Sequence, residues 1–137
     1  MSFHVEHINP PGLRVNPAFT NVIVTSGPAK RIIIGAVDPV DDKGALVGAG
    51  DLTAQTEQIF NNLETMLRAA GATLEDVVIW RIFVVQGQSP QEGAAVFFRR
   101  WGNRPNPPAN TIVFVPELGY PGALVTLEAE AVIPAQA

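Results

Sequence analysis

The last apolar run of the chain, residues 123–133, constrains the fold more than any other stretch, because its side chains alternate strictly in character. Every odd position is Ala, Val, Leu or Ile, whereas the even positions include Thr126, Glu128 and Glu130. Successive side chains of a strand point to opposite faces of a sheet. The pattern therefore predicts a strand with one wholly apolar face, to be covered by helices, and a second face on which polar groups lie among apolar ones.

Two segments have the pattern of the covering helices. Asp51 is a good N-cap, and apolar residues then recur at helical spacing until Gly71, which is predicted to end the helix as a C′ glycine. The second segment opens with Ser89–Glu92, which has the form of a capping box with proline at the first helical position. This helix is predicted to run to Trp101 and to end at Gly102.

The remaining apolar runs are β-branched and short, as expected of strands. Five strands are predicted, at residues 21–25, 31–36, 77–85, 111–115 and 123–133. The first two flank a stretch with turn chemistry, residues 26–30, and are predicted to form a hairpin. The resulting order is ββαβαββ, and a length of 137 residues without repeats or a linker indicates a single domain over residues 1–137.

Composition excludes several classes of function. The chain has no cysteine, so disulfides, a thiolate nucleophile and a zinc-thiolate site are ruled out. A net charge of −4 argues against nucleic-acid binding, which is driven by clustered Lys and Arg. The densest basic group is Arg99, Arg100 and Arg104, and a solvated helix end accounts for it better than a nucleic-acid patch, because cations favour that end of the helix dipole.

The N-terminal segment offers a possible metal-binding pair, His4 and His7. No acid or cysteine cluster accompanies the pair, so a polar chain terminus is predicted there and no metal is assigned. No apolar run approaches the roughly 18 residues of a membrane span. The start MSFHVEHINP lacks the basic and apolar regions of a signal peptide, so a cytoplasmic location without membrane partners is expected.

The second face of the predicted sheet, with Thr126, Glu128 and Glu130 among apolar residues, is not covered by the predicted helices. The strand at residues 77–85 adds Arg81 to this face, between Ile79 and Phe83. With both helices on the other side, a second copy of the chain is predicted to cover this face, although a solvated sheet is the alternative. Arg81 and Glu128 are interpreted as an ion pair enclosed by that assembly, and a functional role for the two charges is the second interpretation.

Residues 9–19, 35–84 and 121–132 (NPPGLRVNPAF, GAVDP to RIFV, and PGALVTLEAEAV) together resemble the Rid family, the reactive intermediate deaminases, also called the YjgF family and formerly the L-PSP endoribonucleases. The resemblance implies a chorismate-mutase-like α+β fold with a mixed sheet and two helices on one face. It also implies a homotrimer with a central β-barrel and ligand clefts between subunits. The implied reaction is hydrolysis of enamines and imines, such as 2-aminoacrylate, to a carbonyl compound and ammonia without a cofactor.

The resemblance also assigns Asn110 to the family's cleft, at the entrance of the strand at residues 111–115. In the deaminating members the residue after Pro-Ala at this point is an arginine, which holds the substrate carboxylate as a fork. A neutral amide cannot reproduce that contact, which is worth about 1.5 to 3 kcal/mol. Asn110 is therefore a substrate-binding candidate with altered specificity, or it caps or anchors the loop. Ile112 stands where many members have a cysteine.

At most of the other cleft positions too, this chain has a less polar or uncharged residue in place of the family's residue. Ile34 matches a serine of the family and Phe19 matches a tyrosine, whereas Gly35 is retained and can offer its backbone N–H to a ligand. Thr126 matches the glutamate that positions the attacking water, and Glu128 matches the second glutamate of that strand. Thr126 and Glu128 are the candidate catalytic residues, although a threonine hydroxyl can bind a water but cannot act as a base near neutral pH.

These residues predict a small-molecule protein of the Rid type, most simply a cofactor-independent enamine or imine deaminase with an altered substrate. Standard 2-aminoacrylate deaminase activity is not expected, because the carboxylate-binding arginine and the water-positioning acid are both replaced. The alternative is a non-catalytic protein that uses the same trimer to bind a small metabolite or a partner protein.

Overall fold

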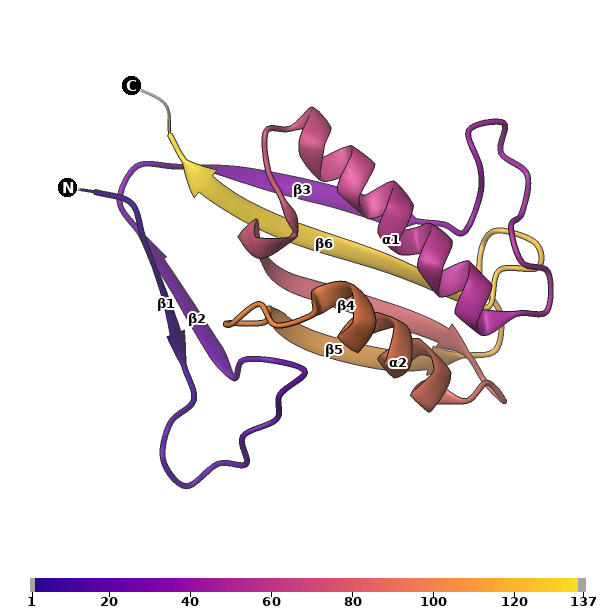
Figure 1. Cartoon of the computed structure of the whole chain (residues 1–137), viewed down its shortest axis with the longest axis horizontal. Coiled ribbons are helices and arrows are strands. Elements are labelled where there is room, and N and C mark those ends of the chain that lie inside the picture. The colour runs from indigo at the N-terminus through magenta and orange to yellow at the C-terminus, as the bar shows by residue number, and fades with distance from the viewer. Residues whose placement is uncertain (1, 136–137) are drawn as a thin grey trace.

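The computed structural model describes residues 2–135, which form a four-stranded sheet with two helices and a separate two-stranded sheet (Figure 1). In chain order the elements are β1 (His4–Ile8), β2 (Val22–Ser26), β3 (Ala29–Val37), α1 (Leu52–Ala69), the 3-10 helix η1 (Leu74–Asp76), β4 (Val77–Val85), α2 (Pro90–Trp101), β5 (Ala109–Val115) and β6 (Val125–Pro134).

The larger sheet has the strand order β3-β6-β4-β5. β6 runs antiparallel to β3 and β4, whereas β4 and β5 are parallel, so the sheet is mixed. The parallel pair requires a crossover connection, and α2 supplies it. Both helices lie over the same face of the sheet (Figure 1). The expected α+β class, with two helices on one face of a mixed sheet, is confirmed.

β6 is a central strand and shows the alternation of its sequence. Along Val125–Ala131 the odd residues are buried and the even residues are half-buried. The buried set faces the helices, and the half-buried set lies on the opposite face, called the outer face below. Only one face of this sheet is therefore covered within a single protomer, because both helices lie on the same side.

α1 begins where its capping residue predicts. Asp51 Oδ1 accepts a hydrogen bond from the Ala54 N–H at 3.1 Å, which satisfies a backbone donor that has no partner within the helix. After the helix, Gly71 adopts φ 83°, the left-handed conformation of a C′ residue. The apolar stripe between these ends is buried: Leu52, Ile59, Phe60, Leu63 and Leu67.

α2 begins at Pro90 as predicted, but the predicted capping box is wrong. Ser89 accepts no hydrogen bond from the helix N-terminus, and its hydroxyl donates to Gln91 Oε1 at 3.0 Å. The other half of the predicted box, Glu92, accepts a hydrogen bond from Thr53 Oγ1 of α1 at 3.4 Å. A contact between the helices thus takes the carboxylate that a local box would have used.

The predicted hairpin of residues 21–25 and 31–36 is also wrong. β2 pairs antiparallel with β1, which the sequence analysis assigned to a polar terminus, and β3 pairs with β6. Next to β6, Ile34 faces the helices and is only 7% exposed. Pairing with the central strand β6 places Ile34 and Val37, the two buried residues of β3, in the hydrophobic core, which is favourable.

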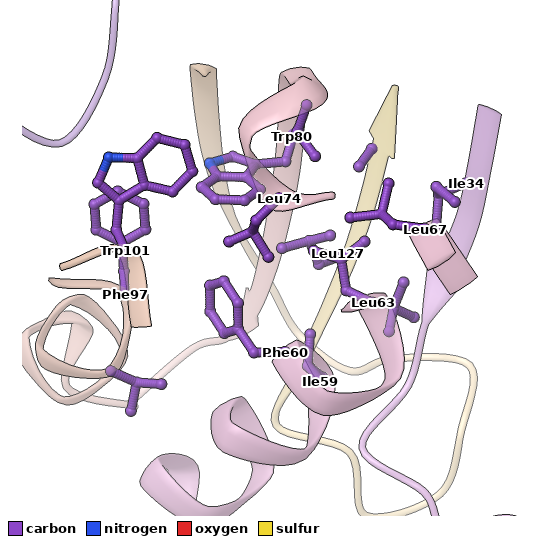
Figure 2. Packing of buried hydrophobic residues seen from close by; sticks show 14 of the residues in the cluster. Ile34, Ile59, Phe60, Leu63, Leu67, Leu74, Trp80, Phe97, Trp101 and Leu127 are labelled. Carbon is purple, nitrogen blue, oxygen red and sulfur yellow. The ribbon is translucent and has the colours of Figure 1, made fainter. Parts of the chain in front are cut away.

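Aromatic rings join the helices to the sheet. Trp80 on β4 is 1% exposed and meets Phe60, Phe97 and Trp101 edge to face, with ring centroids 5.8, 5.5 and 6.1 Å apart. Figure 2 shows Phe97 and Trp101 together on one side of this cluster and Phe60 on the other. Such pairs contribute about 0.5 to 1.5 kcal/mol each beyond burial, so they fix the helices relative to β4.

Candidate functional site

Asn110 and Ile112 lie on β5, which forms one edge of the larger sheet. The parallel register pairs Asn110 with Trp80 and Ile112 with Ile82. Because Trp80 is buried against the helices, Asn110 and Ile112 face the helix layer too. The two residues are therefore placed on the covered side of the sheet, at its edge.

The N-terminal loop is held against the start of β5. Thr20 is 2% exposed, and its hydroxyl donates to Pro107 O at 2.6 Å while its N–H donates to Pro108 O at 3.2 Å. These bonds bring Ala18 to the neighbourhood of Asn110. Phe19, the predicted aromatic of the site, lies half-buried in the same loop, but its side chain does not line the cavity that Ala18 lines.

A cavity of about 110 Å³ lies between the two helices and the sheet, bounded by β4, β5 and β6. Four of the residues that line it are labelled in Figure 2: Ile59 and Phe60 from α1, Phe97 from α2, and Leu127 from β6. The walls are apolar except at two side chains. They are formed by Ala18, Leu52, Thr56, Ile59, Phe60, Ile82, Val84, Pro90, Gly93, Ala94, Phe97, Phe98, Asn110, Ile112, Val125 and Leu127.

The two polar residues of this cavity differ in their bonding. Thr56 is satisfied, because its hydroxyl donates to Leu52 O at 2.7 Å. Asn110 Oδ1 is buried, and it has no hydrogen-bond partner among the residues that the structure describes. The proposed role of Asn110 as a cap or anchor of the loop is therefore not supported by any bond to its Oδ1 within residues 2–135.

Ile34 and Gly35 do not join Asn110 within a protomer. They lie on β3, at the opposite edge of the larger sheet from β5. Ile34 belongs to the hydrophobic core, and Gly35 lies at an irregularity in the pairing of β3 with β6. The residues that the sequence analysis placed in one cleft are thus divided between two edges of the sheet.

Thr126 lies on the outer face and has an acidic neighbour that the sequence analysis missed. Its hydroxyl is 3.0 Å from Val37 O and 3.1 Å from Asp38 Oδ1. Asp38 follows β3 directly, and the irregular pairing after Ile34 brings it beside β6. The only sequence signal was an acid three residues after Gly35. Thr126 and Asn110 lie on opposite faces of the sheet, so one chain by itself does not bring them together.

Four charged side chains form a row across the outer face. Arg81 Nε lies 2.6 Å from Glu128 Oε1, and Arg81 Nη2 lies 3.3 Å from Glu130 Oε2. Arg31 Nη2 lies 2.8 Å from Glu130 Oε1. The hydrogen bond from Arg31, aided by Arg81 and opposed by desolvation, lowers the pKa of Glu130 below its usual value. The hydrogen bonds to Glu128 and Glu130 raise the pKa of Arg81.

A metal site has no support in the part of the chain that the structure describes. No group of three potential ligands from His, Asp or Glu occurs within residues 2–135. His4 and His7 lie three positions apart on β1, and side chains at that spacing point to opposite faces of a strand. None of the helices between residues 2 and 135 is long and apolar enough to cross a membrane.

Comparisons with known proteins agree with this architecture. Residues 17–133 match the model of the family Endoribonuclease L-PSP. The chain is similar to the Rid-family protein YyfB of Yersinia pestis, with 32% identity and a TM-score of 0.81 over 94% of this chain and 98% of that one. It is also similar to Rv2704 of Mycobacterium tuberculosis, a member of the YjgF/YER057c/UK114 family, with 30% identity and a TM-score of 0.62 over 84% and 86% of the two chains. The chain therefore belongs to the Endoribonuclease L-PSP family, which is the YjgF/Rid family.

Proposed function

We propose that this chain is a homotrimeric, cofactor-independent hydrolase of the Rid type, which acts in the cytoplasm on an enamine or imine that has no carboxylate. The observation that carries this proposal is Asn110 on the wall of an apolar cavity, at the position where the deaminating members have their arginine. A carboxylate placed there would be buried without a cationic partner, which costs several kcal/mol. The site therefore favours a neutral substrate.

The proposed reaction adds one water to the C=N bond and releases a carbonyl compound and ammonia. It requires a water held near the carbon and a group that accepts the proton of that water. Thr126 and Asp38 lie 3.1 Å apart and supply these two roles, with the hydroxyl holding the water and the carboxylate accepting the proton. Glu128, the second catalytic candidate, is assigned instead to the ion pair with Arg81.

The trimer is part of the proposal, because Asn110 and Thr126 lie on opposite faces of the sheet. Ligand clefts between protomers allow the cavity side of one chain to meet the outer face of another. A non-catalytic metabolite-binding protein is the second candidate function. It is favoured by the bonding of Thr126, whose hydroxyl already contacts Val37 O and Asp38.

A matched pair of imines tests the proposed reaction. An amine oxidase generates the imine of isobutylamine in situ, and an amino-acid oxidase generates the imine of valine, which differs only by a carboxylate. We expect the chain to accelerate carbonyl formation from the isobutylamine imine and to leave the valine imine at its spontaneous rate. The variant Asp38→Asn should lose the acceleration. No acceleration of either imine would contradict the hydrolase and favour the metabolite-binding protein.

A further inference from the structure

The cavity behind Asn110 extends from β5 to both helices. Of its walls, Thr56 and Phe60 come from α1, and Gly93 and Phe97 come from α2. These residues belong to the helix layer of one chain, so this space is present within a single chain. A ligand bound at Asn110 has this space available for its hydrocarbon part.

We infer that the cavity holds a short branched aliphatic group whose neutral end offers both an N–H donor and an acceptor lone pair to the amide of Asn110. The inference deepens the proposed function and rests on it for the reaction, since an imine C=NH is such an end group. For binding it rests on the cavity alone, so binding and turnover can be tested separately.

The size and lining of the cavity select the aliphatic group. An engineered apolar cavity of about 150 Å³ accepts benzene and stays dry without it. The present cavity, at about 110 Å³, fits a smaller group, such as an isopropyl or isobutyl chain. Ile112 and Phe98 line the cavity and are 49% and 46% exposed, so they stand at its mouth.

The unpartnered oxygen of the Asn110 amide selects the polar end of the ligand. A buried polar group without a partner costs about 1 to 3 kcal/mol, so a ligand that satisfies Asn110 gains that energy. The amide has one acceptor and one donor group, and it complements a ligand that also has both. No cationic side chain lines the cavity, so a carboxylate would enter without a counter-charge.

Three probes of nearly the same shape isolate these features. Isobutyramide has a donor and an acceptor, methyl isopropyl ketone has an acceptor only, and isobutyrate is charged. Their binding to the isotope-labelled full chain is followed by amide resonances, including those of Thr56, Phe97 and Asn110. We expect isobutyramide to bind about threefold to tenfold more tightly than the ketone. Isobutyrate should bind at least about tenfold more weakly than isobutyramide.

Two variants connect the binding to this cavity. A Cβ added at Gly93 meets no atom within 4 Å, so Gly93→Leu places its side chain in open space and should abolish isobutyramide binding. The matched control is Gly119→Leu, because Gly119 also has open space around it but lies in an exposed turn outside the cavity. Asn110→Leu should lower the affinity for isobutyramide to that for the ketone.

Each outcome decides the inference. Equal or tighter binding of isobutyrate, unchanged isobutyramide binding in Gly93→Leu, or an unchanged preference in Asn110→Leu would overturn it. Isobutyramide selectivity without imine turnover would support this inference and contradict the proposed hydrolase. Turnover of the valine imine without isobutyramide selectivity would overturn the inference while the hydrolytic activity stands.

Discussion

Glu130 is the side chain on which the charges of the outer face converge, since it accepts hydrogen bonds from both Arg31 and Arg81. These contacts lower its pKa in the folded protein, so the carboxylate is more stable folded than unfolded. The corresponding stability is present above the unfolded pKa, near 4.5, and is lost as the pH falls through the lower folded pKa.

The variant Glu130→Gln should therefore be less stable than the wild type at pH 7, by at least about 1 kcal/mol, because Arg31 and Arg81 lose the carboxylate that they share. The difference in the free energy of unfolding should shrink as the pH falls below about 4.5. Denaturant unfolding at a series of pH values measures it. A difference that stays constant from pH 7 to pH 3 would show that the effect is not the titration of this carboxylate.

At the scale of the elements, the two helix starts have different origins. The start of α1 has a local bond from Ala54 N–H to Asp51, whereas the start of α2 has Pro90 and no side-chain capping bond. We therefore expect Asp51 and Ser89, which have similar sequence signals, to differ in their effect on stability.

We expect Asp51→Ala to lower the free energy of unfolding by about 1 kcal/mol, because it leaves a helix N–H without its side-chain acceptor. Ser89→Ala is the matched control and should change it by less than about 0.5 kcal/mol, because Ser89 makes no capping bond. Thermal and denaturant unfolding compare the two variants. Equal losses would show that Ser89 caps α2 in solution.

At the scale of the whole molecule, the outer face is the surface that a single protomer leaves uncovered. Ile33 and Val113 lie on it, 67% and 38% exposed, next to the row of charges. We expect a second and a third copy to cover this face, giving a particle of about three times 14.6 kDa. Light scattering at micromolar concentration measures the mass, and a monomer would contradict both the trimer and the site shared between protomers.

The stability of Arg81 variants also tests whether a partner covers the outer face. In one protomer the side chains of Arg81 and Glu128 are 35% and 38% exposed, and a pair this accessible contributes at most about 1 kcal/mol. If a partner covers the face, Arg81→Met should cost about 3 to 5 kcal/mol, because it strands Glu128 in an enclosed site. Glu128→Gln should cost less, since Arg81 keeps its contact with Glu130. A loss of under 1 kcal/mol for Arg81→Met would indicate a solvated face.

The sequence alone determined the elements whose signals are local. Residues 77–85 form a strand with the predicted bounds, α1 ends before Gly71, and β6 has the predicted two faces, because periodicity and backbone preference act over a few residues. The family resemblance also indicated the α+β class. Asn110 became a candidate from sequence because a neutral residue occupies a position that the family resemblance predicts to be charged.

Only the tertiary structure decided which segments meet. β3 pairs with β6 instead of β2, Glu92 turns to Thr53 instead of capping α2, and Asp38 reaches Thr126. The apolar space behind Asn110 is likewise formed by α1, α2 and three strands. Each of these contacts joins residues far apart in the chain, and its free energy depends on the surface buried when the whole sheet and both helices pack together. Local patterns in the sequence do not show which of these alternative long-range contacts is the more favourable.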